Sequence, residues 1–321
     1  MSEFIDEINK FYNIERKFML FPIMEKVRST SYQSDNVYKS MGEDSAAIFL
    51  HNSNDEDLIL ITTDAINEEF SKSNPWSAGF CSILVSIEDI YACGGYPLAA
   101  TSILSSDDEM VRTALLDGII DATKKFRVPL VRGHTADNTK NISVSATIIG
   151  RILRENYISA GNAQIGDKML IIADFDGKVA KTNKYYWDTV TFKSSDEIMK
   201  KRTFMNKLAE YHYANSSKDI SNGGLFGTMV LLLKYSDVGA KINIGNLELP
   251  DILLQKGYTQ KEYSRMYMTT AFLITCDPHY EEDIENLAEE YGLNANTIGE
   301  IIDSNSIVLS YQDEERELWR L

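Results

Sequence analysis

The sequence predicts an α/β protein of two domains, and three observations support this fold class. The chain has 321 residues, of which 44% are hydrophobic, so it can form two domains of about 150 residues, each with its own core. Apolar stretches rich in β-branched residues alternate with longer stretches of helical periodicity. A turn-rich segment at residues 161–167 precedes a second series of such stretches. We therefore divide the chain into domains of residues 1–152 and 153–321.

In the first half, the predicted order is strand, strand, helix, strand, helix, strand, strand, which fits a sheet with helices on one face. Apolar residues at helical spacing predict one or two amphipathic helices over residues 1–30, and a polar loop at 31–40 follows them. The remaining elements of this half are strands near 46–48 and 58–64, a helix within 74–97, a strand at 98–104, a helix at 107–126, and strands at 129–131 and 142–151.

The second half repeats the alternation of strands and helices. The predicted elements are a strand at 168–173, a helix at 195–215, a loop at 218–225, a helix at 226–235, strands at 240–244 and 267–275, a helix at 280–291, and strands at 298–302 and 306–309. The aromatic segment 185–188 could stack on a ligand ring or close a core or interface.

Composition argues against several classes of function. The formal net charge of −16 argues against nucleic acid and anionic membranes as partners, although a nucleotide stays possible where cations screen its phosphates. The three cysteines lack Cys-x-x-Cys spacing and predict neither a disulfide framework nor a structural zinc site. Without a signal peptide or an apolar run near 18 residues, the chain is expected to be cytoplasmic.

The helix within residues 74–97 carries one acid, Asp89, on a face that otherwise reads as buried. Asn74 is expected to accept hydrogen bonds from the first free amides, Pro75 suits the first helical position, and Gly94 and Gly95 supply the stop. A carboxylate on such a face is costly unless it is paired, hydrogen-bonded or bound to a cation. Asp89 could therefore meet an Arg, a Lys or backbone amides, or it could bind a metal.

Two further acids lie at the ends of apolar elements. Asp44 precedes the first strand, and Asp64 ends the run of residues 58–64. Each acid alone could cap a turn. Together with Asp89, they match what a magnesium-phosphate site needs, because Mg²⁺ takes one or two carboxylates and completes its shell with water and phosphate oxygens.

Several motifs that combine acids with Gly, Ser or Thr follow one another along the chain. They are GEDSAAI (42–48), TTDAINEEF (62–70), VSIEDIYACGGYPLA (85–99), VRGHTADN (131–138), ISVSATIIGRI (142–152), DISNGGLFG (219–227) and SDVGAKI (236–242). Taken in this order, the motifs resemble the PurM-like superfamily, which contains aminoimidazole-ribonucleotide synthetase, thiamine-monophosphate kinase, selenophosphate synthetase and the hydrogenase-maturation dehydratase. The finer match is closest to the AIR-synthase-related subgroup that includes the methanogenesis-marker type.

The resemblance implies a PurM-like fold with a ferredoxin-like mixed sheet in the N-terminal domain, helices on one face of it, and a C-terminal α/β sandwich. It implies a homodimer through the N-terminal domains, with ATP and Mg²⁺ in a cleft near that interface, and phosphoryl transfer to a small molecule. The residue roles that it implies are metal ligands Asp44, Asp64 and Asp89, nucleotide contacts Thr62, Thr63, Gly133, His134 and Thr135, and catalytic residues Asp219 and Asn222.

Departures from the family pattern keep a second hypothesis open. His134 stands where the family usually has an acid, and Asn222 stands where the kinase-like motif has a second acid. An amide binds Mg²⁺ more weakly than a carboxylate and cannot act as a base. The alternative is therefore a nucleotide-binding dimeric scaffold with reduced turnover. No cysteine precedes Cys81, which argues against selenophosphate synthetase activity.

Overall fold

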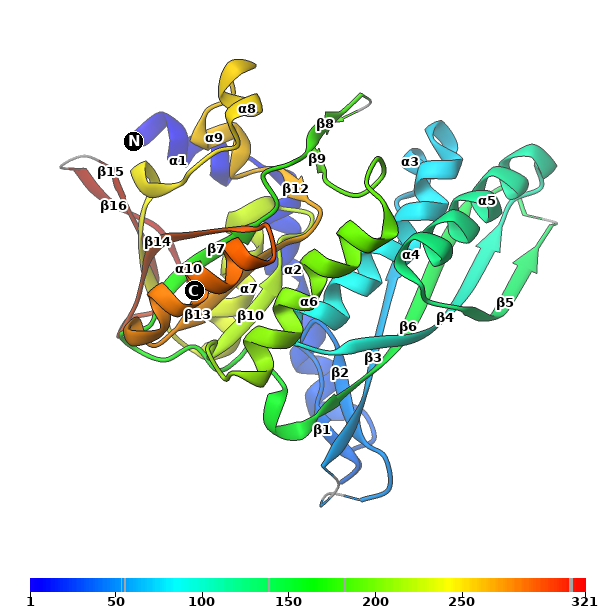
Figure 1. Cartoon of the computed structure of the whole chain (residues 1–321), viewed down its shortest axis with the longest axis horizontal. Coiled ribbons are helices and arrows are strands. Elements are labelled where there is room, and N and C mark those ends of the chain that lie inside the picture. The colour runs from blue at the N-terminus through cyan, green and yellow to red at the C-terminus, as the bar shows by residue number, and fades with distance from the viewer. Residues whose placement is uncertain (53, 55, 138, 182, 312–313) are drawn as a thin grey trace.

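The computed structural model describes residues 1–321 except 53, 55, 138, 182, 312 and 313 (Figure 1). Residue 138, the last of the motif at 131–138, thus lies outside the described residues. Two mixed sheets, each with helices packed on it, form the body of the molecule. The predicted fold class is confirmed. Among the described residues, no helix has both the length and the apolar character needed to cross a membrane.

The first half of the chain forms a six-stranded sheet with its helices on one face (Figure 1). Only β4 and β5 pair in parallel among the described pairs of this sheet, so the sheet is mixed. The strands, in spatial order, are β1 (Val37–Lys39), β2 (Ala46–Phe49), β3 (Asp57–Ala65), β6 (Ser143–Leu153), β4 (Tyr96–Ser105) and β5 (Leu130–Ala136). The helices are α3 (Glu68–Ser73), α4 (Pro75–Ala92) and α5 (Glu109–Phe126).

Helices α4 and α5 cross closely because glycines face each other at the crossing. A Cβ on Gly79 would lie 1.9 Å from the Leu115 carbonyl oxygen, and one on Gly118 would lie 2.0 Å from the Trp76 carbonyl oxygen. The apolar face of α4 then packs on β3 and β6. This packing fixes α4, and therefore Asp89, against the sheet.

The second half forms a seven-stranded mixed sheet and a small three-stranded sheet. The large sheet has the order β10 (Ser216–Asp219), β13 (Ala271–Cys276), β7 (Lys168–Ala173), β14 (Asn294–Ile302), β11 (Gly239–Asn243), β15 (Ser306–Tyr311) and β16 (Glu314–Arg320). The small sheet consists of β12 (Tyr267–Met268), β9 (Asn183–Asp188) and β8 (Lys178–Ala180). The helices are α6 (Ser195–Glu210), α7 (Gly224–Ser236), α8 (Asp251–Gln255), α9 (Gln260–Tyr263) and α10 (Glu281–Glu290), with 3₁₀ turns at Arg154–Asn156, Ile244–Asn246 and Pro278–Tyr280.

The N-terminal helices α1 (Ser2–Asn9) and α2 (Tyr12–Thr30) pack on the second half of the chain. Phe4 contacts Phe226 of α7 edge-on, with ring centroids 5.9 Å apart, and Phe18 contacts Trp319 of β16 at 5.6 Å. Residues 1–30 therefore share a core with the C-terminal half. The division at residue 152 stays a prediction.

Several local expectations differ from the structure. The strand expected at 267–275 is divided into β12 and β13, which belong to different sheets. Lys218 and Asp219 were expected in a loop, but they end β10, which pairs with β13. The RGHT segment lies inside β5 instead of after it. The Asn74 side chain makes no capping hydrogen bond, because Asn74 also ends α3 and its side chain donates to Ser73.

Candidate functional site

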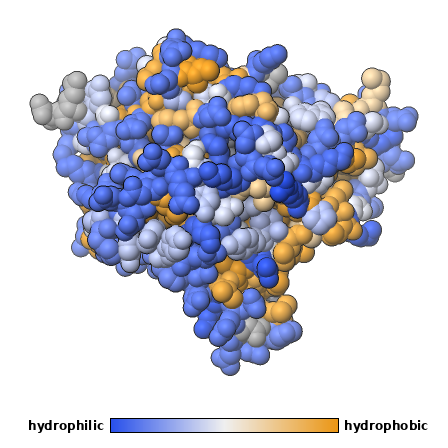
Figure 2. All heavy atoms as spheres, viewed as in Figure 1, coloured by the Kyte–Doolittle hydropathy of each residue, from blue (hydrophilic) through white to orange (hydrophobic). Residues whose placement is uncertain are grey.

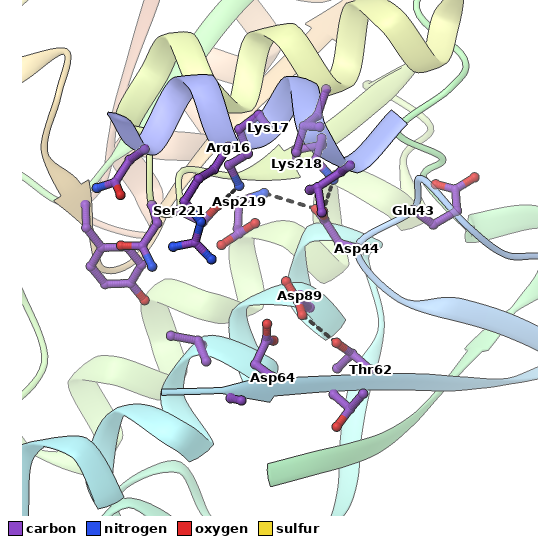
Figure 3. Close-up of a pocket in the computed structure, with 18 of the residues that line it drawn as sticks. Arg16, Lys17, Glu43, Asp44, Thr62, Asp64, Asp89, Lys218, Asp219 and Ser221 are labelled. Carbon is purple, nitrogen blue, oxygen red and sulfur yellow. Dashed lines mark hydrogen bonds and ion pairs between the residues drawn. The ribbon is translucent and has the colours of Figure 1, made fainter. Parts of the chain in front are cut away.

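A cavity of about 380 Å³ lies between the two halves of the molecule. Its lining comes from α2, the segment before β2, β3, α4, β10 and the turn before α7 (Figure 3). Of the residues predicted from the sequence, it brings together Asp44, Thr62, Thr63, Asp64, Asp89, Asp219 and Asn222.

Three carboxylates meet in this cavity. One oxygen from each of Asp44, Asp89 and Asp219 lies within 4.8 Å of the other two. They come from three separate elements, since Asp44 precedes β2, Asp89 is on α4 and Asp219 ends β10. Asp64 lines the same cavity outside this group, and its carboxylate accepts a hydrogen bond from Ser86 at 3.4 Å. Asp219, predicted as a catalytic acid, therefore joins two of the predicted metal ligands.

Asp89 forms no ion pair with a Lys or Arg in the described part of the chain. Its carboxylate accepts a hydrogen bond from the Thr62 hydroxyl. Burial raises the pKa of Asp89 well above its ordinary value, and the carboxylates of Asp64, Asp219 and Asp44 raise it further. A cation bound here would relieve both causes.

The acid of α4 that does meet an arginine is Glu88. Glu88 is 2% exposed and pairs with Arg202 of α6, which is fully buried. The Glu88 carboxylate also accepts from the Thr270 amide at 3.1 Å. The ion pair with an arginine that the sequence allowed for Asp89 is thus formed by the adjacent residue, Glu88. No feature of the sequence had indicated a role for Glu88. This pair ties α4 to the second half and leaves Asp89 facing the cavity.

Asp44 and Asp219 are held together by backbone and by Lys218. The Lys218 ammonium donates to the Asp44 carboxylate, and the Asp219 amide donates to the other Asp44 oxygen at 3.1 Å. Burial raises the pKa of Asp219 well above its ordinary value, and Asp44 adds to the shift. Burial alone would lower the pKa of Lys218, but Asp44, Asp219 and Asp89 together outweigh burial, and the pKa is raised. Lys218 therefore stays charged beside the acids.

The segment that carries Asp44 is anchored by its neighbour Glu43. The Glu43 carboxylate accepts from the Ser159 hydroxyl at 2.6 Å and from the Ala160 amide at 2.7 Å. Burial raises the pKa of Glu43 despite these hydrogen bonds. Glu43 thus fixes the strand entry on which Asp44 lies.

Asn222 reaches the cavity from a turn that requires glycine. Gly223 and Gly224 have φ of 107° and 62°. A Cβ on Gly224 would also lie 2.3 Å from the Ser264 carbonyl oxygen. The turn therefore tolerates no side chain after Asn222, and α7 begins directly behind the cavity.

Helix α2 forms the wall that faces Asp64 and Asp89 across the cavity, and the sequence did not indicate this role. Figure 3 shows Arg16 pointing from α2 toward Asp64 and Asp89. Lys17 donates to the Ser221 hydroxyl at 3.2 Å, and burial lowers its pKa although Asp219 opposes the shift. Neither cation forms an ion pair within the described residues. The only sequence signal was the adjacent pair Arg16-Lys17 inside a helix, which by itself reads as a solvated face.

The remaining predicted nucleotide contacts lie elsewhere. Gly133, His134 and Thr135 belong to β5, the edge strand of the six-stranded sheet. Two strands separate β5 from β3, which puts these residues about 14 Å from Thr62 and Thr63 in the sheet direction. They do not line the cavity, and their roles stay predictions.

The donor set fits a hard divalent cation. Asp44, Asp89 and Asp219 offer carboxylate oxygens only, and such cations prefer oxygen ligands. The negative charges of the three carboxylates repel one another, and a bound cation would remove this repulsion. Lys218 compensates one of the charges through its ion pair with Asp44. No cysteine or histidine belongs to this group of described residues, so a thiolate or imidazole site for a softer metal is not formed here.

Comparison with known proteins places this geometry in a family. The profile of the AIR synthase related protein N-terminal domain matches residues 42–152, and that of the C-terminal domain matches residues 175–312. The chain belongs to the AIR synthase related family. The predicted superfamily is confirmed.

Curated relatives and solved structures that resemble this chain include proteins with named activities and one without. The protein MJ0640 of Methanocaldococcus jannaschii, which is uncharacterised, is 29% identical over 97% of this chain and 94% of its own length. Selenide, water dikinase of Clostridioides difficile is 27% identical over 68% of this chain and 65% of its own length. Among solved structures, T. maritima PurL complexed with ADP has a TM-score of 0.71 at 15% identity and covers 88% of this chain.

A second solved structure matches at nearly full length. AaThiL complexed with AMPPCP and TMP has a TM-score of 0.66 at 18% identity, covering 94% of this chain and 96% of its own. By contrast, this chain spans 46% of the PurL chain. At these identities the structures establish the shared fold.

Proposed function

We propose that this protein is an ATP- and Mg²⁺-dependent enzyme that transfers a phosphoryl group to a small molecule or activates that molecule by phosphorylation. The observation that carries the proposal is the meeting of Asp44, Asp89 and Asp219 in a cavity whose opposite wall carries Arg16 and Lys17. Carboxylates can hold metal ions and cations can face phosphate oxygens, and phosphoryl transfer needs both. The kinase among the relatives and the nucleotide-bound structures support this assignment.

In this proposal, Asp44, Asp89 and Asp219 hold Mg²⁺, with Asp64 on the same wall. When bound, the cation neutralises phosphate charge and orients the phosphate oxygens. Thr62 positions Asp89 through its hydrogen bond, and Lys218 holds Asp44 in place. Lys17 stabilises charge on the transferred phosphoryl group from the α2 side. Asn222 orients the acceptor by hydrogen bonding, since its amide cannot take a proton from it.

We also propose that two copies pair through the open face of the six-stranded sheet. Ile103 of β4 is 54% exposed, and Ile61 of β3 is 37% exposed. Figure 2 shows apolar side chains gathered at the lower right of the molecule, over the strands of this sheet. His134 is paired with Ile103 in register and faces the same side. Sedimentation analysis tests the pairing: the parent chain should be a dimer and Ile103→Glu a monomer. A monomeric parent would contradict it.

Isothermal titration with a non-hydrolysable ATP analogue and Mg²⁺ tests the proposed activity at its first step. Asp89→Asn should weaken Mg²⁺-dependent nucleotide binding about a hundredfold or more, because it removes a charged ligand. The control Asp117→Asn removes the same charge from an exposed position of α5 and should bind like the parent. Equal binding by Asp89→Asn and the parent would overturn the proposal.

A second function, that of a nucleotide-binding scaffold, is favoured by one observation. Asn222 faces the cavity where a carboxylate would strengthen metal binding. Turnover separates the two functions. The enzyme should release ADP when supplied with Mg²⁺, ATP and a pool of phosphate-acceptor metabolites. Nucleotide binding without ADP release across the pool would favour the scaffold.

A further inference from the structure

We infer that a second cavity beside the acidic one is the acceptor subsite, and that it takes a small molecule with an anionic group, held by Arg16, and a polar uncharged body. This inference rests on the proposed function, since it identifies the class of molecule that would receive the phosphoryl group.

The second cavity has a volume of about 300 Å³ and adjoins the acidic one. The two share lining residues, among them Asn13, Arg16, Asn222 and Tyr267. A molecule in the second cavity would therefore lie next to phosphates held by the acidic one. Its volume is at the small end of ligand sites, which suits a small metabolite.

The charges of the two cavities differ sharply. The acidic cavity is lined by Glu43 and four aspartates together with Arg16, Lys17 and Lys218, so its acids outnumber its cations. Among the described residues that line the second cavity, Arg16 is the sole charged side chain. Burial raises the pKa of Cys81 in its wall to about 12, so this thiol stays neutral. An anionic group is thus repelled from the first cavity unless metal is bound, whereas in the second it meets one cation and no carboxylate.

Arg16 is available to such a group. In the described part of the chain its guanidinium forms no hydrogen bond or ion pair, and its nearest ring, that of Tyr12, is 6.0 Å away. A guanidinium with free donors matches a carboxylate or phosphate in two hydrogen bonds. Its position in both linings places the anionic group of the acceptor at the junction of the cavities.

The rest of the wall offers neutral hydrogen-bonding groups. Asn13, Asn67, Asn183 and Asn222 line the cavity, and their side-chain amides can donate hydrogen bonds. The oxygens of Asn67 and Asn183 already accept from the amides of Phe70 and Tyr185. The Tyr267 hydroxyl is buried and has no hydrogen-bond partner among the described residues. Leaving such a group unpaired is costly, and a bound polar molecule would satisfy it. This composition favours a body with hydroxyl, amide or ring nitrogen atoms.

Matched pairs of small probes test the inference on the full chain. The probes are phenyl phosphate with phenol, glycerol 3-phosphate with glycerol, and benzoate with benzamide, observed by saturation-transfer NMR. The protein is first saturated with Mg²⁺ and a non-hydrolysable ATP analogue, whose binding is measured separately. Each charged probe should bind at least tenfold more tightly than its neutral partner, because hydrogen bonds to a charged group contribute about tenfold or more.

Substitutions assign the effect to Arg16. Arg16→Gln should weaken the charged probes by about tenfold to a hundredfold, and Arg16→Lys should recover part of the loss. Lys26→Gln removes a charge from an exposed position of the same helix outside both cavities and should change nothing. If the analogue binds but charged probes show no preference, fail to bind at millimolar concentration, or bind equally to Arg16→Gln, the inference is overturned while the proposed function stands. If the analogue itself fails to bind, the proposed function fails and the inference fails with it.

Discussion

The two walls of the acidic cavity differ in how the chain builds them. The acid wall joins residues at the ends of β3 and β10, before β2 and on α4, all elements fixed in the sheets or packed on them. The basic wall is a single helix, α2, which packs on the second half of the chain and carries Arg16 and Lys17. The positions of the acids are therefore fixed by the sheets, whereas the positions of the two cations depend on how α2 packs on the second half of the chain.

The two walls also carry charges of opposite sign, and burial disfavours the charged form on each wall. Burial and the repulsion of neighbouring carboxylates raise the pKa values of Asp89 and Asp219, so the ionised forms of these acids are unfavourable without a cation. Burial lowers the pKa of Lys17, so its ammonium form is unfavourable without an anion nearby. A metal nucleotide would relieve both, because it brings cations to the first wall and phosphates to the second.

The largest expected effect is a loss of stability when Lys218, the partner of Asp44 in the acid wall, is removed. Lys218→Met should lower the free energy of unfolding by about 3 to 5 kcal/mol, because it leaves the Asp44 carboxylate buried without its partner. Lys241→Met is the matched control, since Lys241 pairs with Glu315 at the surface, and it should cost about 1 kcal/mol or less. Urea denaturation of the metal-free proteins measures both. Equal losses for the two variants would show that the Lys218 pair has no special role.

Removing a cation tests the basic wall. Lys17→Gln should weaken binding of the ATP analogue in Mg²⁺ by about tenfold to a hundredfold, because it removes a charged donor that faces the acids and the phosphates between them. Lys26→Gln on the exposed side of α2 should bind like the parent. Isothermal titration gives both affinities. An unchanged affinity for Lys17→Gln would mean that α2 only covers the cavity.

The pH dependence of stability reports on the strain in the acid wall. Because the folded-state pKa of Asp89 is raised above the unfolded value of about 3.9, the folded state binds more protons between these two values. The free energy of unfolding of the metal-free protein should therefore fall as pH rises through this window. Asp89→Asn should make that fall smaller, because the amide does not titrate.

Thermal denaturation between pH 4 and pH 8 measures this difference, with Asp117→Asn as the control. Mg²⁺ should restore the stability of the parent at pH 8 and leave Asp89→Asn nearly unchanged. A parent protein whose stability rises from pH 4 to pH 8 without metal, to the same extent as Asp89→Asn, would contradict the account of the acid wall.

The smallest expected effect adds an acid to the cavity. Asn222→Asp places a carboxylate where an amide now stands, and more ligand charge should tighten Mg²⁺ binding about threefold to tenfold. Titration of Mg²⁺ in the presence of the ATP analogue measures the change. Unchanged or weaker Mg²⁺ binding would show that position 222 lies too far from the cation for its side chain to act as a ligand.

Much of the fold and of the acid wall could be predicted from the sequence. Each acid there closes or interrupts a recognisable apolar element, so local periodicity marks Asp44, Asp64 and Asp89. The α4 prediction was correct in its ends, but it could not tell which of two adjacent acids meets an arginine. Glu88 finds Arg202, which is 114 residues away in the sequence. That distant partner is set by the packing of α6 on α4 and α5 and has no local signature.

The basic wall could not be predicted for the same reason. Arg16 and Lys17 lie in an ordinary helix, and that helix is held over the acids by contacts with residues far away in the sequence, such as those of Phe18 with Trp319 and of Lys17 with Ser221. The placement of Asp219 in β10 likewise depends on pairing with β13, some 50 residues later in the chain. Long-range pairing, which local patterns do not encode, therefore decides which side chains share the cavity.

A crystal structure with Mn²⁺ and a non-hydrolysable ATP analogue tests the central claim most directly. Manganese replaces magnesium at oxygen sites and can be located by its anomalous scattering. We expect anomalous peaks among the carboxylates of Asp44, Asp89 and Asp219, with the phosphates between them and α2. Peaks absent from these carboxylates, or a nucleotide bound outside the cavity between the two halves, would contradict the central claim.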